Sequence, residues 1–264
     1  MSRIALIAGR GVLPAILATA LPKRPLVCAL AGFLPEGLAV DQTFRIERLA
    51  LFLRLLQDEG VTQVCFAGAV ERPQLDPALF DPQTAQMVPR LLAAMTQGDD
   101  ATLREVLAIF EEAEFEIVPV QAIVPGLVPA AGHLVGTPSP QDSADCARAE
   151  VIVTALGSVD VGQGAVVAGG LCLAVEALPG TDAMLRGVAG LPASLRPKGG
   201  VFYKAAKPGQ DLRIDLPTLG PSTVELAAKA GLSGIAFQAG GVICLDLPEM
   251  ITSAAAKGLF LWAR

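Results

Sequence analysis

The densest group of chemically useful side chains lies in one stretch, residues 200–223. Two lysines, two aspartates and an arginine fall there within twelve positions: Lys204, Lys207, Asp211, Arg213 and Asp215. Ammonium groups suit phosphate oxygens, and two carboxylates on one face can hold a hard divalent cation or activate a water molecule. The stretch therefore has the groups that chemistry on a phosphate would need.

A strand is the element that would align these groups. Residues 211–215 alternate polar and apolar, and a strand turns successive side chains to opposite faces. Asp211, Arg213 and Asp215 would then share one face, with Leu212 and Ile214 on the other. A solvated edge strand that carries only an ion pair would show the same alternation, so this segment alone leaves both interpretations open.

Composition narrows the class of protein. The chain has 264 residues, of which 52% are hydrophobic and 17% are charged, so it can bury a sizeable core. Its net charge of -6 argues against a surface for duplex nucleic acid. The longest uncharged run, residues 117–141, is broken by prolines and cannot form a continuous apolar helix. The scattered cysteines have no CxxC spacing, which indicates buried thiols in a reducing cytoplasm.

His133 is the only histidine in the chain. A Ser-His-Asp or Cys-His mechanism and a multi-histidine metal site are therefore disfavoured. Any metal ion must be held by oxygen ligands.

The N-terminal residues are typical of a nucleotide-binding α/β unit. An apolar strand over residues 3–8 is followed by Gly9-Arg10-Gly11 and an apolar helix to about residue 21, whose first amides would face an anion. The third glycine of a GxGxxG fingerprint falls on Pro14, and the second strand, residues 25–30, does not end in an acid. The incomplete pattern leaves a phosphate or nucleotide turn at Gly9 and Gly11 open, and it disfavours NAD.

Residues 1–125 are predicted to form a Rossmann-like domain with a mostly parallel sheet. Its further elements are strands at 61–67 and 115–120 and helices at 47–59, 84–96 and 101–112. Asp99 and Asp100 precede the last helix, where one would cap it and leave the other for a ligand.

Residues 126–140, rich in proline and glycine, are predicted to be a linker, and residues 141–264 a distinct α+β domain with hairpins. One hairpin is expected around Gly169-Gly170 and another around Gly240-Gly241. Thr181 is a candidate helix cap, and Ser222 with Glu225 has the spacing of a capping box.

Four groups of segments, in this order, resemble the LpxI family of UDP-2,3-diacylglucosamine pyrophosphatases. They are residues 7–14 (IAGRGVLP), 97–100 (QGDD), 160–167 (DVGQGAVV) with 176–185 (EALPGTDAML), and 204–208 (KAAKP) with 213–220 (RIDLPTLG). The resemblance extends from residue 3 to residue 262. Two departures are the Gly-Arg-Gly turn, where Gly-Gly-Gly is expected, and a short connection after Pro192.

The resemblance implies a Rossmann-like domain and a distinct C-terminal domain with the ligand between them. It also implies hydrolysis of a pyrophosphate to UMP and 2,3-diacylglucosamine 1-phosphate (lipid X) in lipid A biosynthesis, with Mg²⁺ as cofactor and Mn²⁺ as the alternative. Asp215 matches the aspartate of the family segment R-x-D-L-P-T-x-G, so we assign it as a catalytic residue and metal ligand. Asp211 and Asp182 are assigned as catalytic helpers, Asp211 also as a metal ligand.

The substrate contacts are hypotheses from the chemistry that attack of water on a pyrophosphate needs. Lys204 and Lys207 would hold the diphosphate, Thr181 would donate to it, and Gly9 and Gly11 would approach the nucleotide. Further contacts are assigned to Asp99, Asp100, Arg213 and Thr218.

The expected partner is a lipid-linked nucleotide sugar, and no nucleic acid is expected. Because the substrate is a lipid, a cytoplasmic enzyme would contact the inner membrane peripherally, and its size favours a homodimer. The alternative is a non-catalytic nucleotide-sugar or lipid-binding protein, in which the acids merely cap helices. A nucleotide-dependent kinase is disfavoured because the chain has no GxxxxGK[ST] run.

Overall fold

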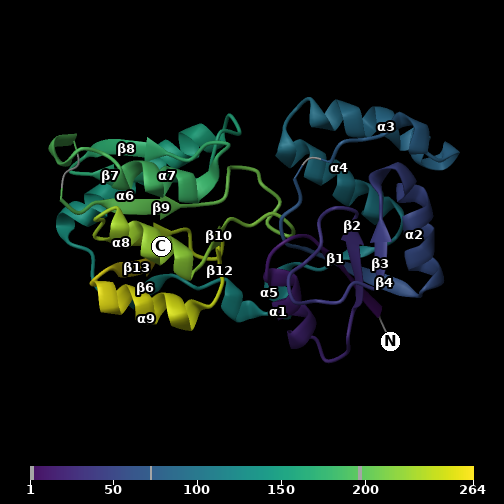
Figure 1. Cartoon of the computed structure of the whole chain (residues 1–264), viewed down its shortest axis with the longest axis horizontal. Coiled ribbons are helices and arrows are strands. Elements are labelled where there is room, and N and C mark those ends of the chain that lie inside the picture. The colour runs from purple at the N-terminus through teal and green to yellow at the C-terminus, as the bar shows by residue number, and fades with distance from the viewer. Residues whose placement is uncertain (1–2, 72, 196–197) are drawn as a thin grey trace. The chain divides into compact units, whose positions relative to one another are not determined.

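A computed structural model describes residues 3–71, 73–195 and 198–264 (Figure 1). The chain folds as two compact units, residues 1–125 and 126–264. The predicted fold class is confirmed. The first unit has a parallel sheet with helices, and the second has a mixed sheet that includes a hairpin.

The sheet of the first unit is parallel throughout its described strands, in the order β3-β2-β1-β4-β5. The strands are β1 (Arg3–Ala8), β2 (Leu26–Leu30), β3 (Gln42–Phe44), β4 (Val61–Ala67) and β5 (Glu116–Ile117). All five residues of β2 are buried, which explains its continuous apolar sequence.

The helices of this unit are α1 (Leu13–Ala20), α2 (Leu49–Asp58), α3 (Pro82–Met95), α4 (Asp99–Glu112) and α5 (Val120–Ile123), with 3₁₀ turns at Ile46–Arg48 and Pro77–Leu79. Helix α2 shows why they form. Its apolar residues at 49, 52, 53 and 56 make one buried stripe, and Phe52 stacks on Phe44 with ring centroids 4.0 Å apart.

Two details of the first unit differ from the prediction. The strand expected at 115–120 is only β5, because α5 begins at Val120. The N-cap of α4 is Gly98, whose φ of 126° suits only glycine, and the helix already includes Asp99. The predicted aspartate cap at Asp99 or Asp100 is therefore wrong.

The main sheet of the second unit has the order β6-β13-β11-β9-β7-β8. The strands are β6 (Gly132–Val135), β7 (Gly164–Ala168), β8 (Leu171–Val175), β9 (Val201–Lys204), β11 (Gly234–Phe237) and β13 (Phe260–Ala263). The central strands β9, β11 and β13 run parallel, and β6 and β7 flank them antiparallel. A separate parallel pair consists of β10 (Thr218–Leu219) and β12 (Ile243–Cys244).

Helices cover both faces of this sheet. They are α6 (Pro140–Gly157), α7 (Gly180–Ala189), α8 (Pro221–Lys229) and α9 (Leu247–Lys257), with 3₁₀ turns at Pro125–Leu127 and Ala193–Leu195. Val201 and Tyr203 of β9 pack with α6, whereas Phe202 packs with α7, α8 and α9 on the opposite face. The alternation along β9 therefore places α6 on one side of the sheet and the other three helices on the other.

The predicted strand at residues 211–215 is wrong. The segment is a turn, in which the Asp215 N–H donates to the Asp211 carbonyl oxygen at 3.2 Å. The Asp211 carboxylate accepts from the Arg213 backbone N–H at 3.0 Å. A short side chain that binds the backbone two residues on stabilises a turn in competition with a strand.

Of the two predicted hairpins, only the one at Gly169-Gly170 is confirmed, by the antiparallel pairing of β7 with β8. The hairpin at Gly240-Gly241 is wrong, because β12 pairs with β10 and β11 lies between β9 and β13. In the segment predicted as a linker, residues 126–140, β6 pairs with β13, and His133 stacks on Trp262 at 5.2 Å.

Helix caps in the second unit also differ from the prediction. The N-caps of α7 and α8 are Pro179 and Gly220, so Thr181 and Ser222 do not cap them. Glu225 instead pairs with Lys257 at 2.8 Å. None of the helices in the described ranges combines the length and apolarity that crossing a membrane requires.

Candidate functional site

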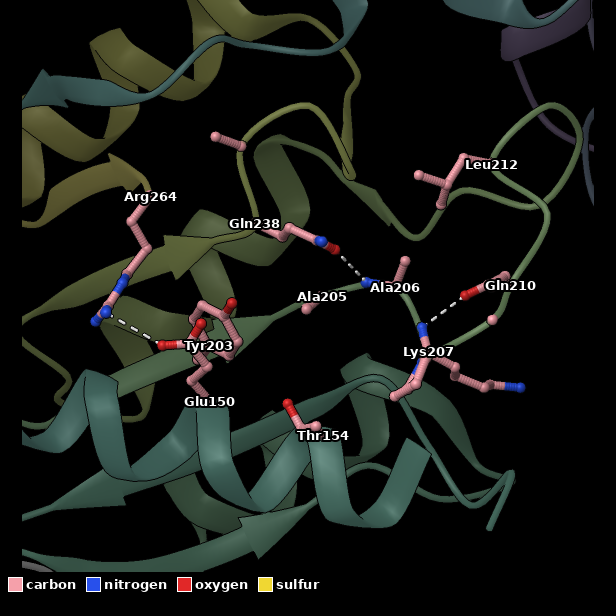
Figure 2. A pocket seen from close by; sticks show the side chains of 13 residues that line it. Glu150, Thr154, Tyr203, Ala205, Ala206, Lys207, Gln210, Leu212, Gln238 and Arg264 are labelled. Atoms are coloured by element: carbon pink, nitrogen blue, oxygen red, sulfur yellow. Dashed lines mark hydrogen bonds and ion pairs between the residues drawn. The ribbon is translucent and has the colours of Figure 1, made fainter. Parts of the chain in front are cut away.

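In the second unit, a polar pocket lies where the three parallel strands end. Its volume is about 520 Å³, and its wall comes from the loop after β9, from the residues after β11 and β13, and from α6 (Figure 2). The lining residues are Glu150, Thr154, Tyr203, Ala205, Ala206, Lys207, Pro208, Gly209, Gln210, Leu212, Gln238, Ala239 and Arg264. The carboxyl ends of parallel strands are where ligands gather in open α/β sheets.

Two glutamines hold the backbone of the loop after β9. Gln238 accepts from the Ala206 N–H at 3.0 Å, and Gln210 accepts from the Lys207 N–H at 2.8 Å (Figure 2). On the opposite wall Arg264 pairs with Glu150 at 3.1 Å. These contacts fix the course of the loop that carries Lys207 and leads to Asp215.

Lys204, the last residue of β9, is a buried cation with 5% of its surface exposed. Its ammonium group donates to the Thr181 hydroxyl at 2.5 Å and to the Glu176 carboxylate at 3.3 Å. Burial lowers the pKa of Lys204, whereas Glu176 and, more weakly, Asp182 act to raise it. The pKa of Lys204 is still lowered, so burial outweighs these carboxylates, and added negative charge would stabilise the ammonium form.

The segment 160–164 (DVGQG) connects this cluster to the pocket. The Asp160 carboxylate accepts from the Lys207 ammonium group. Gly162 and Gly164 lie against Glu176: a Cβ on Gly162 would lie 2.0 Å from the Glu176 carbonyl oxygen, and one on Gly164 would lie 2.7 Å from Oε2 of the Glu176 carboxylate. Position 162 therefore requires glycine, because its neighbour is backbone, whereas a side chain at position 164 would have to displace the Glu176 carboxylate and the Phe202 ring.

Gln163, between those glycines, makes two further contacts. Its carbonyl oxygen accepts from the Ala205 N–H at 3.0 Å, and its side-chain amide donates to Oε1 of Gln210 at 2.9 Å. The amide of Gln210 in turn donates to the Asp215 carboxylate. Lys204, Lys207 and Asp215 are thus linked through one short segment.

The aspartates do not share a strand face, contrary to the prediction. Asp211 pairs with Arg213, with Oδ2 2.7 Å from Nη2 of the guanidinium group, while Asp215 contacts Gln210. Asp182 lies in the first turn of α7, where it pairs with Arg186 at 3.1 Å and contributes to the electrostatic field at Lys204. Thr218 opens β10 with an exposed side chain.

The predicted metal ligands, Asp211 and Asp215, do not form a ready-made cation site. Within the described ranges, no group of three or more His, Cys, Asp or Glu residues could hold a metal ion. Mg²⁺ is commonly bound through one or two carboxylates together with substrate phosphates. The Asp215 carboxylate, which accepts from the Gln210 amide, is a single ligand of the kind that this mode uses, and the Asp211 carboxylate pairs with Arg213.

In the first unit, Gly9 is needed for a close approach of two loops. A Cβ on Gly9 would lie 2.6 Å from the Ala69 carbonyl oxygen, and one on Gly68 would lie 2.7 Å from that of Arg10. Arg10 and Ala69 exchange backbone hydrogen bonds of 2.9 and 3.0 Å, which join the loops after β1 and β4.

The amide of Gly9 is already used, because it donates to the Ala67 carbonyl oxygen at 2.7 Å. Gly11 has a φ of 92° and lies just before α1, whose N-cap, Val12, gives no side-chain cap. Helix α1 also has Pro14 near its start, which removes one amide donor. Gly9 therefore serves the packing of the two loops, whereas Gly11 adjoins the start of α1.

The two remaining predicted contacts begin α4. Asp100 pairs with Arg104 at 3.0 Å, one helical turn on. The side chain of Asp99 lies outside the described part of the structure. Nothing in these contacts assigns Asp100 to a ligand.

Sequence reasoning assigned no site role to four residues that join the site, Asp160, Gln163, Glu176 and Gln210, although the first three lie in the family-like segments. Two are amides, which a search for titratable or metal-binding groups passes over. The available signal was Gln163 between two glycines, because paired glycines indicate close backbone packing around the residue they enclose.

Comparison with known proteins covers both units. The family model described as the LpxI N-terminal domain matches residues 3–127, and that of the LpxI C-terminal domain matches residues 130–262. A curated relative from Caulobacter vibrioides, the UDP-2,3-diacylglucosamine pyrophosphatase LpxI, is 40% identical over 271 residues, covering 99% of this chain and 97% of the relative.

Proposed function

The chain belongs to the LpxI family, and on that premise we propose that it hydrolyses the pyrophosphate bond of UDP-2,3-diacylglucosamine. The products are UMP and 2,3-diacylglucosamine 1-phosphate (lipid X), a step in lipid A biosynthesis. The 40% identity to the Caulobacter vibrioides pyrophosphatase, over nearly the full length of both chains, is the observation that carries the proposal. The contacts in the second unit support it independently, since they are suited to a diphosphate.

The diphosphate is held by Lys204 and Thr181. The Thr181 hydroxyl oxygen accepts from the Lys204 ammonium group, so its own proton is oriented away from Lys204 and toward another acceptor. Both groups lie at the first turn of α7, where backbone amides favour an anion. A phosphate oxygen here would accept a hydrogen bond from the Thr181 hydroxyl, and its negative charge would offset the buried ammonium charge. Lys207 and Arg213 contribute further positive charge.

Asp215 acts on the attacking water or holds the cation. Hydrolysis forms a bond from the water oxygen to phosphorus and breaks the bond to the bridging oxygen, which leaves with the electron pair. The carboxylate of Asp215 takes the proton that the water loses. Asp182 and Asp211 assist by shaping the field around the lysines and around Arg213.

The cofactor in this proposal is Mg²⁺, with Mn²⁺ as a substitute. When bound, the cation neutralises the phosphate oxygens. Asp215, together with the substrate phosphates, is the residue that would hold it. The backbone at Gly11 faces the nucleotide.

The partner and the location follow from the substrate class. A lipid-linked nucleotide sugar lies in a membrane leaflet, so we place the protein in the cytoplasm with peripheral contact at the inner membrane. We also propose a homodimer, the commonest symmetric assembly for a protein of this size.

The test is release of UMP from UDP-2,3-diacylglucosamine by the purified chain. We expect release with Mg²⁺ or Mn²⁺, none with a chelator, and a fall of about 10²–10³-fold in kcat for Asp215→Ala, the usual cost of a lost transition-state charge contact. Asp58→Ala, an exposed carboxylate at the end of α2, is the matched control and should retain full rate. Binding of the substrate without turnover would instead identify a carrier protein, and a strict need for ATP would identify a kinase.

A further inference from the structure

Gln210 is a buried amide that contacts both a proposed phosphate-binding residue and the proposed catalytic carboxylate. The residue is 7% exposed. Oε1 accepts from the Lys207 N–H at 2.8 Å, and Nε2 donates to Oδ2 of Asp215. A neutral side chain has no acid–base role in hydrolysis, so its burial at this position needs another explanation.

The orientation of this amide is set by its neighbours. A backbone N–H can only donate, so the atom of Gln210 that faces Lys207 must be the oxygen. The Gln163 amide also donates to that oxygen, at 2.9 Å. The NH₂ end of Gln210 must then face Asp215, and it contacts a carboxylate, which only accepts when ionised.

The support behind Gln210 is rigid. Gln163 belongs to the segment whose glycines lie directly against Glu176, and its carbonyl oxygen accepts from the N–H of Ala205, the first residue after β9. The backbone of Gln163 is thus bonded to the sheet, and hydrogen bonds run from the Gln163 side chain to Gln210 and from Gln210 to Asp215. A carboxylate that receives a charge-assisted hydrogen bond from an oriented donor is confined to one rotamer.

Gln238 is a natural comparison within the same pocket. It too accepts from a backbone N–H of the loop after β9, that of Ala206, at 3.0 Å. If Gln210 only stabilised this loop, Gln210 and Gln238 would be equivalent. Of the two, Gln210 has the contact with Asp215.

We propose that Gln210 is a positioning residue, which orients the Asp215 carboxylate for the reaction, and that Gln163 fixes Gln210. The inference rests on the proposed function, because it concerns how that activity is achieved. Loss of an orienting partner behind a catalytic or metal-binding group commonly costs 10–100-fold in activity. The change should lie mainly in kcat, because Gln210 acts on Asp215 and the substrate is held by other groups.

The test is Gln210→Glu, which keeps the oxygen that accepts from Lys207 and replaces the donor to Asp215 by a second carboxylate oxygen. We expect kcat for UMP release to fall about 10–100-fold, with KM within about threefold of wild type. Gln238→Glu adds the same charge to the same pocket. Its kcat should stay at least threefold higher than that of Gln210→Glu. The kcat of Gln163→Met should lie between those of Gln210→Glu and Gln238→Glu, because the Lys207 N–H still orients Gln210.

A second measurement does not depend on activity. Gln210→Glu should lower the melting temperature by placing two carboxylates in contact. Adding Asp215→Asn restores a donor and an acceptor with the polarity reversed, so the double variant should recover the melting temperature while remaining inactive. An amide at position 210 that made no hydrogen bond to Asp215 would show no such recovery, so this measurement tests the bond and the kcat comparison tests its role in the reaction.

The outcomes separate the two proposals. If the wild type and Asp215→Ala behave as proposed but Gln210→Glu keeps its kcat, or loses no more than Gln238→Glu, the positioning role is overturned and the hydrolase stands. If the wild type releases no UMP, the proposed function fails. In that case the melting temperature of the double variant still decides whether Gln210 and Asp215 are bonded.

Discussion

Replacing Lys204 by methionine should lower both the free energy of unfolding and the rate of UMP release, and a second substitution at Glu176 should separate the two effects. The side chains of Lys204 and Glu176 are 6% and 12% exposed, with 3.3 Å between Nζ and Oε2. Lys204→Met leaves the Glu176 carboxylate buried without its cation, and removal of one partner of a buried pair costs about 3–5 kcal/mol. The same change removes a charge contact to the diphosphate, which commonly costs about 10²–10³-fold in rate.

Glu176→Gln in the Lys204→Met background distinguishes the two effects. The neutral amide no longer needs the ammonium group, so most of the lost free energy of unfolding should return, while UMP release should stay at the level of the single variant. Urea unfolding measures the first quantity, and UMP release at saturating substrate measures the second. A single variant as stable as wild type would refute the energetic argument. Full recovery of rate in the double variant would refute the assignment of Lys204 to the diphosphate.

Two further predictions concern the same cluster. Because burial lowers the pKa of Lys204 from its ordinary 10.5, the unfolded chain binds more protons than the folded chain between the two pKa values, so the free energy of unfolding should rise with pH across that window. Urea unfolding at a series of pH values should show this rise for wild type and lose it in Lys204→Met. Gly162→Ala should be destabilised by about 1–3 kcal/mol, since its Cβ would overlap the Glu176 carbonyl oxygen. Its unfolding midpoint, compared with that of Gly187→Ala, where a Cβ has open space, checks this.

Much of the fold could be predicted from residue patterns. Where the apolar pattern was strong, as in β1, β4 and α2, the structure confirms the predicted element to within a few residues. The Gly169-Gly170 turn was predicted correctly because two consecutive positive φ values, 57° and 79°, are what paired glycines permit.

The errors have physical causes that lie outside simple periodicity. The alternation at residues 211–215 indicated a strand, but the Asp211 side chain bonds to the Arg213 backbone and forms a turn. Strand β6 was missed because the prolines and glycines around it suggested a linker, whereas its pairing with β13 depends on residues more than a hundred positions away. Propensity carries no information on such partners.

The candidate site was predicted in Lys204, Lys207, Thr181 and Asp215, whereas no role was predicted for Asp160, Glu176 or the two amides, Gln163 and Gln210. Lys204 and Thr181 contact each other, although they were proposed separately for the same diphosphate. Gln163 and Gln210 were invisible to a search for acids, bases and metal ligands, because their importance lies in the direction in which their hydrogen bonds run.

The backbone bridge between Arg10 and Ala69 has a mechanical consequence for the N-terminal sheet. Because main-chain atoms alone form it, and because Gly9 and Gly68 leave no space for a side chain, the turns that follow β1 and β4 must move together. A molecule that displaced one of them would displace the other as well, whatever the side chains on either. The two turns are thus one structural unit at the end of the sheet, held together by their own backbone amides.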